Sequence, residues 1–195
     1  MNGGKGKEPA PILALDLARR MGWAYGTPGT LPRHGSVTLG PPGSDIDTIG
    51  AAFVRWLTDF RKLSPVGVLY VEAPVSASHM AGKTNATTLL NLYGLYALSV
   101  VIGKMAGIGK RRIASVQQVR KHFLGTARPA DKKKAVIARC RMLGWQPQDD
   151  NAADALALWA YGCAEEAPRA AIATAPLFSA NGVPTFASVD TEVPF

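Results

Sequence analysis

The feature of this sequence that most constrains its fold is a pair of short apolar runs, each of which ends on an acid. The runs are PILALD at residues 11–16 and VGVLYVE at residues 66–72, so the acids are Asp16 and Glu72. Apolar runs of this length, rich in Val, Ile and Leu, are typical of buried strands. A charge at the end of such a strand is costly to bury unless it has a partner or a cation. The pattern therefore predicts a sheet that carries two carboxylates at the ends of central strands.

The remaining elements follow from turn signals and apolar periodicity. Residues 22–26 and 33–39 are expected to continue the first run as an antiparallel meander, because short turns separate the three segments. A short edge strand is expected at residues 112–114. Helices are expected from Asp45 or Asp47 up to Pro65, and at residues 89–105, 115–123, 130–143 and 149–163. This order predicts an α/β, RNase H-like fold: a central mixed five-stranded sheet, its first three strands antiparallel, flanked by helices.

The two ends of the chain differ in composition from the middle. Residues 1–10 are rich in Gly and Lys and residues 166–195 in Ala, Pro, Ser and Thr, so both are expected to be flexible. Residues 11–165 are then expected to form one RNase H-like domain. We expect no membrane span and no signal peptide, and the two cysteines lack the spacing of a zinc site. These features together predict a cytoplasmic protein.

Positive charge is concentrated in one stretch of the chain. The net charge is +8, and residues 104–142 contain twelve Lys and Arg residues but one acid, Asp131. A basic stretch of this kind is the electrostatic footprint of a protein that binds a phosphate backbone. The alternative is a solvated surface without a ligand.

Two further acids lie in an otherwise apolar helical segment. Asp150 and Asp154 are four residues apart and so share one helix face, whereas either Asp149 or Asp150 can cap the helix. If this helix packs across the two central strands, its acids converge with those at the strand ends. Such a group of carboxylates suits Mg²⁺ or Mn²⁺, and two ions about 4 Å apart can hydrolyse a phosphodiester.

Three segments carry the most specific pattern of the sequence: ILALDLARRMGWAYG, VLYVEAP and DDNAADALALWAYG. In order and spacing they resemble the metal-binding motifs of RuvC-type Holliday junction resolvases, particularly short phage-borne ones. TTLLNLYGLYALSVV and RRIASVQQVRKHFLG resemble the family's DNA-facing helix and its basic strand and helix. The resemblance covers residues 11–163. It implies a Mg²⁺-dependent crossover junction endodeoxyribonuclease with two ions, held by these catalytic residues: Asp16, Glu72, Asp150 and Asp154.

The sequence departs from the family pattern at two places. Asn151 lies three residues before Asp154, where the family often has an acid, so Asp149 and Asp150 both remain candidate ligands. The family's Asp-Pro-Gly turn is replaced by Asp16-Leu17-Ala18. This second departure is expected to alter the conformation of the turn, while Asp16 remains a metal ligand.

The same resemblance implies partners. Branched DNA, above all a four-way junction, is expected to contact a loop at residues 76–88 and these cations: Lys83, Arg120, Lys121, Lys132, Lys133 and Lys134. Symmetric cleavage needs two active sites, so a homodimer is expected, and the helix at 89–105 is a candidate interface through Leu92, Tyr93, Leu95, Tyr96 and Val100.

The last residues of the chain, Val193-Pro194-Phe195, resemble the terminal peptide of bacterial single-stranded DNA-binding proteins. They are candidates for docking on host repair proteins, and the alternative is a short acidic end that offsets the basic stretch. For the whole chain, two other functions stay open: a catalytically silent DNA-binding relative, and an RNase H-like nuclease acting on flaps or hybrids.

Overall fold

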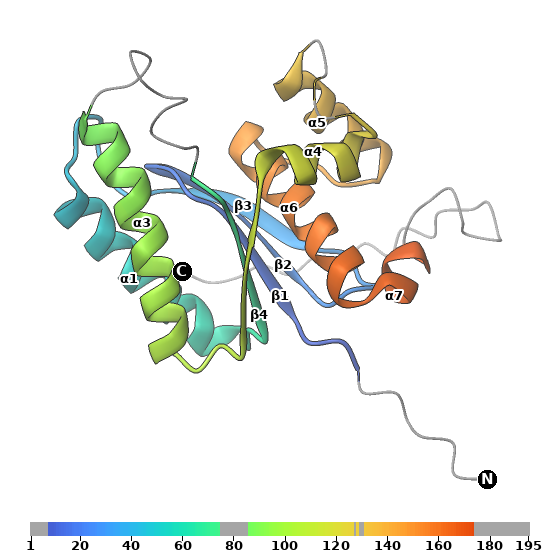
Figure 1. Ribbon diagram of the computed structural model, residues 1–195, viewed down its shortest axis with the longest axis horizontal. Coiled ribbons are helices and arrows are strands. Elements are labelled where there is room, and N and C mark those ends of the chain that lie inside the picture. Colours follow the sequence, from blue (N-terminus) through green and yellow to red (C-terminus); the bar gives the residue numbers. More distant parts are fainter. Residues whose placement is uncertain (1–7, 75–85, 127, 129–130, 174–195) are drawn as a thin grey trace, which may run out of the picture.

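The computed structural model describes residues 8–74, 86–126, 128 and 131–173. It contains one twisted sheet with helices on both faces (Figure 1). The strands are β1 (Ile12–Asp16), β2 (Arg20–Gly26), β3 (Arg33–Thr38), β4 (Val68–Glu72) and β5 (Lys110–Ala114). Their order is β3-β2-β1-β4-β5, with β1 antiparallel to β2, β2 antiparallel to β3, and β4 parallel to both β1 and β5. The predicted mixed five-stranded sheet, its first three strands antiparallel, is confirmed.

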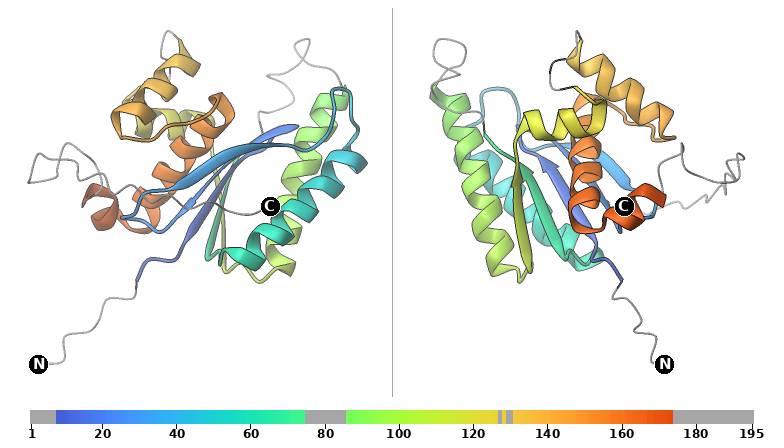
Figure 2. Two further views of the ribbon diagram at one scale, coloured as in Figure 1. Left: turned by 180° about the vertical axis from the view of Figure 1, so that it is seen from behind. Right: turned by 45° about the vertical axis from the view of Figure 1, so that its right-hand side comes forward.

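The helices lie in two layers. They are α1 (Ile46–Leu63), α3 (Ala86–Met105), α4 (Val116–Leu124), α5 (Lys132–Met142), α6 (Asp150–Glu166) and α7 (Pro168–Ala173). Helices α1 and α3 cover one face of the sheet, and α4, α5 and α6 lie on the other (Figure 2). The sheet is therefore buried on both sides, which explains why β1 and β4 are nearly continuous apolar runs.

Side chains of β1 and β4 alternate between two hydrophobic cores. Ile12, Ala14 and Tyr70 belong to the core under α6, whereas Leu13 and Leu69 belong to the core under α1 and α3. Successive side chains of a strand point to opposite faces. The same alternation directs the strand-end acids, two positions beyond Ala14 and Tyr70, to the α6 face.

Local signals explain most helix ends. Ser115 and Gln118 form the capping box of α4, and Gly125 ends that helix with φ 75°. Helix α5 begins at Lys132, after the N-cap residue Asp131, whose side chain accepts a hydrogen bond from the backbone of Lys134. Asp45 occupies the N-cap position of α1, but its side chain makes no capping hydrogen bond.

Ordered structure continues past the boundary predicted at residue 165. Helix α6 extends to Glu166, and α7 follows after the Ala167 N–H bonds to the carbonyl of Cys163. Ala170 of α7 lies against the turn at Gly29, which gives this short helix a packing partner. Helical structure therefore extends to Ala173, eight residues beyond the predicted end of the domain at residue 165.

Candidate active site

Parallel pairing brings the two strand-end acids together. Leu15 of β1 pairs with Val71 of β4, so the next residues, Asp16 and Glu72, end adjacent strands at the same edge of the sheet. By the alternation of side chains along β1 and β4, both carboxylates point toward α6. This edge lies between the N-terminal ends of α3 and α6 (Figures 1 and 2).

Helix α6 brings its acids to this edge through an unusually close backbone contact. Gly22 of β2 is the cross-strand partner of Asp16, and a Cβ built on Gly22 would lie 1.9 Å from the carbonyl oxygen of Asn151. Only a glycine allows the first turn of α6 to lie directly on β2 at this position. Asp150 and Asp154, on either side of Asn151, are thereby placed over Asp16. We call Asp16, Glu72, Asp150 and Asp154 the acid cluster.

Three acids of the cluster, Asp16, Glu72 and Asp154, have raised pKa values. Burial raises the pKa of Asp16 well above its ordinary value, and the charges of Glu72, Asp154 and Asp150 raise it further. Burial and Asp154 raise the pKa of Glu72 to about 7, and burial also raises that of Asp154. Arg120 of α4 acts in the opposite direction on the pKa of Asp16, Glu72 and Asp154. These shifts mean that the carboxylates share one field and that added positive charge would stabilise their ionised forms.

Asp150 differs from the other three acids because it has an ion-pair partner. Lys133 of α5 donates to Asp150, and this contact holds the pKa of Asp150 below its ordinary value. The pKa of Lys133 is raised by the same contact, and the charges of Asp154 and Asp16 also raise it. Lys133 therefore brings a positive charge to the acid cluster.

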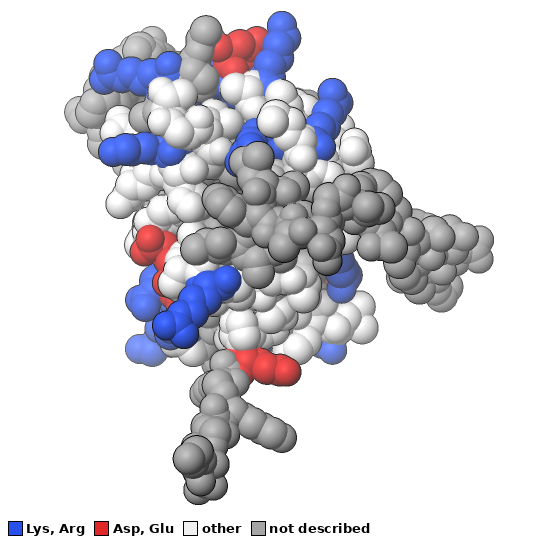
Figure 3. Space-filling model, turned by 90° about the vertical axis from the view of Figure 1, so that its right-hand side faces the viewer, with Lys and Arg blue, Asp and Glu red and all other residues white. Residues whose placement is uncertain are grey.

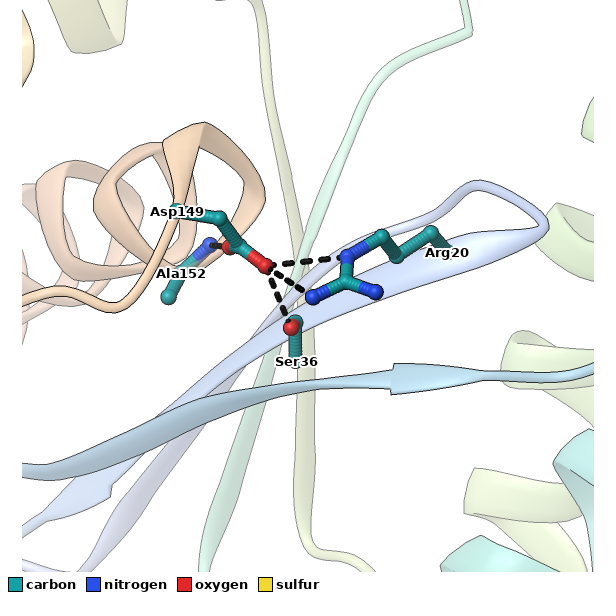
Figure 4. Close-up of polar contacts among 4 residues, drawn as sticks. All are labelled: Arg20, Ser36, Asp149 and Ala152. Carbon is teal, nitrogen blue, oxygen red and sulfur yellow. Dashed lines mark hydrogen bonds and ion pairs between the residues drawn. The ribbon is translucent and has the colours of Figure 1, made fainter.

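Asp149 has a different role from Asp150. Its Oδ1 accepts from the backbone N–H of Ala152 at 2.9 Å, and its Oδ2 accepts from Arg20 Nε at 2.9 Å, Arg20 Nη2 at 2.6 Å and Ser36 Oγ at 2.6 Å (Figure 4). Burial pushes the pKa of Asp149 up, but these hydrogen bonds outweigh it, and the pKa lies below its ordinary value. Asp149 thus caps α6 and attaches the helix to β2 and β3.

The chemistry of the acid cluster fits a divalent cation, although its present geometry is not a ligand sphere. Within the described residues, no group of three or more His, Cys, Asp or Glu side chains is arranged to hold a metal ion. Four carboxylates nevertheless supply the oxygen donors that Mg²⁺ and Mn²⁺ prefer. The mutual repulsion of Asp16, Glu72 and Asp154 is what such an ion would relieve. A pocket of about 170 Å³, lined by Asp16, Glu72, Leu92 and Tyr96 among others, opens beside these acids.

The predicted basic residues that the structure describes lie on two neighbouring helices. Arg120 and Lys121 belong to α4 and Lys132, Lys133 and Lys134 to α5, and Figure 3 shows Lys and Arg side chains around the upper part of this side of the molecule. Lys134 pairs with Asp131 at 3.4 Å, whereas Lys132 is exposed. On β5, alternation brings Lys110 and Arg112 to Glu166, at 2.5 Å and 3.3 Å. Lys83, residues 76–85 of the predicted loop and residues 193–195 lie outside the described residues. The loop prediction is wrong for residues 86–88, because they form the first turn of α3.

Sequence reasoning missed three parts of this site: the contact at Gly22, the Lys133–Asp150 pair and the Arg20–Ser36–Asp149 network. A glycine inside a strand is a signal for close backbone approach and could have indicated the first. The other two join residues up to 129 positions apart, and no local pattern marks them.

Solved structures of other proteins share the fold, and three of them align with this chain as follows. RuvC from Thermus thermophilus aligns with a TM-score of 0.55 at 18% identity, over 76% of this chain and 90% of that chain. The same protein in complex with a Holliday junction substrate aligns with a TM-score of 0.57 at 15% identity, over the same shares. The yeast mitochondrial Holliday junction resolvase Ydc2 aligns with a TM-score of 0.60 at 10% identity, over 85% of this chain and 84% of that chain.

These alignments confirm the RNase H-like fold and the predicted likeness in fold to RuvC-type resolvases. No protein-family model matches the sequence, and no curated protein matches it.

Proposed function

We propose that this protein is a Mg²⁺-dependent endonuclease that hydrolyses phosphodiesters in branched DNA, with the four-way junction as its substrate. The observation that carries the proposal is the convergence of four carboxylates from β1, β4 and α6 beside the cations of α4 and α5. A single domain that joins acids to a basic surface in this way has the parts that phosphodiester hydrolysis requires.

Each part of the site has a role in this proposal. Asp16, Glu72, Asp150 and Asp154 hold Mg²⁺, with Mn²⁺ as a substitute and two ions per site. When bound, the ions activate the attacking water and stabilise the leaving oxygen. Arg120 and Lys133 stabilise the negative charge that builds on the phosphate, because both already lie within the field of the acid cluster. These cations contact the DNA backbone: Lys83, Lys121, Lys132 and Lys134.

A homodimer is part of the proposal, and α3 offers the surface for it. Leu95 is fully buried in the core and is unsuited to an interface, contrary to its candidate role. Other apolar side chains of α3 are exposed, including Leu90 at 58%, Val101 at 52% and Met105 at 78%. A second copy of the chain would cover this surface and supply a second active site.

The apolar character of α3 also allows another interpretation. By length and composition it is the one helix among the described residues that could cross a membrane. However, α3 packs against α1, and Leu95, Ser99 and Gly103 are buried, so lipid cannot surround it in this fold. We therefore favour a protein interface and a cytoplasmic location. Docking of Val193-Pro194-Phe195 on host repair proteins remains a separate proposal from the sequence.

The deciding experiment compares labelled four-way junction, flap, duplex and RNA–DNA hybrid substrates in Mg²⁺ and in EDTA. Asp154→Asn should lower the cleavage rate by at least about 100-fold and leave junction binding intact. Asp59→Asn is the matched control, because Asp59 is exposed on α1 and pairs with Lys62. Binding without cleavage in Mg²⁺ would support the catalytically silent alternative. Cleavage of hybrids alone would support an RNase H-like activity, and a full rate in EDTA would exclude the metal mechanism.

A further inference from the structure

A second pocket adjoins the acid cluster on the side away from α4 and α5. Its volume is about 340 Å³, and it lies between the β1–β2 turn, the loop before α1 and the first turns of α3. It is lined by these residues: Ala18, Arg19, Gly43, Ser44, Thr87, Thr88, Asn91, Leu92 and Leu95. Leu92 also lines the pocket of Asp16 and Glu72, so the two pockets are neighbours. We call this space the Asn91 pocket.

Two of the polar side chains of the Asn91 pocket, Asn91 and Arg19, are held in place by hydrogen bonds to backbone carbonyls. Asn91 Nδ2 donates to the backbone carbonyl of Ser44 at 3.0 Å, which orients the amide. Its Oδ1 is buried and has no hydrogen-bond partner in the structure. Arg19 is held in the wall by a 2.7 Å bond from Nη1 to the carbonyl of Gly40 and keeps other N–H groups available to donate. An oriented acceptor that is buried without a donor calls for a ligand that brings one.

The rest of the lining is suited to a flat, mostly apolar ligand. Leu92, Leu95 and Ala18 contribute apolar surface, and Arg19 is the one cation among the lining residues. A free phosphate would need more positive charge than this, whereas a nucleobase offers ring faces to apolar walls and N–H donors and acceptors at its edge.

We propose that the Asn91 pocket binds one unstacked nucleobase of the strand whose phosphate lies at the acid cluster, a proposal that rests on the proposed function. The base donates an N–H to Asn91 Oδ1 and accepts from Arg19. Position supports this occupant, because only Leu17 separates Asp16 from Ala18, the first pocket residue. Figure 1 shows α3 on the opposite side of the strands from α4 and α5. A DNA strand that comes from the cations of α4 and α5 and crosses the acid cluster would therefore reach the pocket with its next nucleotides. Asn91 then selects the base beside the cleaved phosphate.

The test uses four-way junctions with a single 2-aminopurine at each position around the cleaved phosphate, bound in EDTA so that no cleavage occurs. The fluorescence of 2-aminopurine rises when the base leaves its stack. We expect a rise at one or two adjacent positions. Asn91→Leu, which removes the acceptor, should abolish it, and so should Ala18→Leu, which fills the pocket but keeps the Asn91–Ser44 bond. Gln117→Leu is the control, because it changes an exposed amide of α4 outside the pocket.

A second readout is base preference during cleavage in Mg²⁺. Junctions that differ in the base at the responsive position should be cut by the unaltered protein at rates about tenfold apart, and Asn91→Leu should bring them within about twofold. The pocket proposal is overturned if no position brightens, or if the rise persists in both pocket variants while they fold and bind junctions normally. Junctions that are bound but never cut would contradict the proposed nuclease and leave the fluorescence test of the pocket valid.

Discussion

Helices α6 and α3 cover opposite faces of the same sheet, but they relate to it in different ways. Helix α6 buries residues around most of its circumference, and its first turn touches the backbone of β2 at Gly22. Helix α3 buries Leu95, Ser99 and Gly103 and exposes much of its apolar surface. The placement of α6 is thus determined within the chain, whereas α3 has more apolar surface than the fold of one chain uses.

This difference separates two functions of the molecule. Any change that moves α6 also moves Asp150 and Asp154, because both lie in its first two turns. Changes on the outer side of α3 leave the acid cluster in place and alter what the chain can bind. The following predictions test that separation.

The largest effect is expected from Gly22→Ala. The new Cβ would lie 1.9 Å from the Asn151 carbonyl oxygen, so α6 must shift, and we expect a loss of about 3 kcal/mol or more in the free energy of unfolding. Cleavage should be lost with it. Gly103→Ala on α3 should cost much less, because the nearest atoms, at 3.2 Å, belong to the side chains of Arg111 and Leu69. Urea unfolding of both variants measures the difference. Equal losses in the free energy of unfolding would refute the proposed difference between the packing of α6 and that of α3.

Next in size is a pH effect on stability in EDTA. The pKa of Glu72 is raised from 4.5 to about 7, so between these values the folded protein holds a proton that the unfolded chain releases. Stability should therefore fall as the pH rises from about 5 to 8, by about 3 kcal/mol for this group, with Asp16 and Asp154 acting in the same direction. Glu72→Gln should flatten the decline in urea unfolding, and Mg²⁺ should restore stability at pH 8. If the protein became more stable as the pH rises over this range in EDTA, the proposed repulsion among Asp16, Glu72 and Asp154 would be contradicted.

A smaller pair of effects distinguishes the two adjacent acids at the start of α6. Asp149→Asn weakens the cap and the bonds from Arg20 and Ser36, so we expect a loss of about 1 to 2 kcal/mol in stability and a modest loss in rate. Asp150→Asn should leave stability nearly unchanged, because its Lys133 partner is largely exposed, and lower the rate by about 100-fold. Thermal unfolding and single-turnover cleavage measure the two quantities. If stability and cleavage rate fell in the same proportion in both variants, Asp149 and Asp150 would not have separate structural and catalytic roles.

Much of the fold could be predicted because its signals are local. The apolar runs, the turn glycines and the Ser115 cap each depend on a few neighbouring residues, and they indicated the strands and helices within a few positions. The parallel pairing of the two acid-terminated runs joins distant segments, and no local signal marked it. Helix α7, beyond the predicted end of the domain, lies against the distant turn at Gly29, and no local signal marked this contact.

The site was predictable in its residue types and less so in their partners. The acids stood out because their apolar surroundings penalise charge, which is a local property. Within the basic stretch, Lys110 and Arg112 of β5 pair with Glu166, and the sequence did not indicate these partners. Likewise the choice between Asp149 and Asp150 depends on Arg20 and Ser36, which lie 129 and 113 residues before Asp149.

The smallest effect on stability, and the one most specific to α3, is expected from Val101→Lys combined with Met105→Lys. Both side chains are more than half exposed, so their replacement should change the free energy of unfolding by no more than about 0.5 kcal/mol. If two copies associate through α3, four new charges at the interface should convert a dimer into a monomer in light scattering. Leu63→Lys is the matched control, since Leu63 is exposed at the end of α1. A double variant that stays dimeric would place the interface elsewhere. A monomer that still makes paired cuts in a four-way junction would show that each cut needs one acid cluster and no partner.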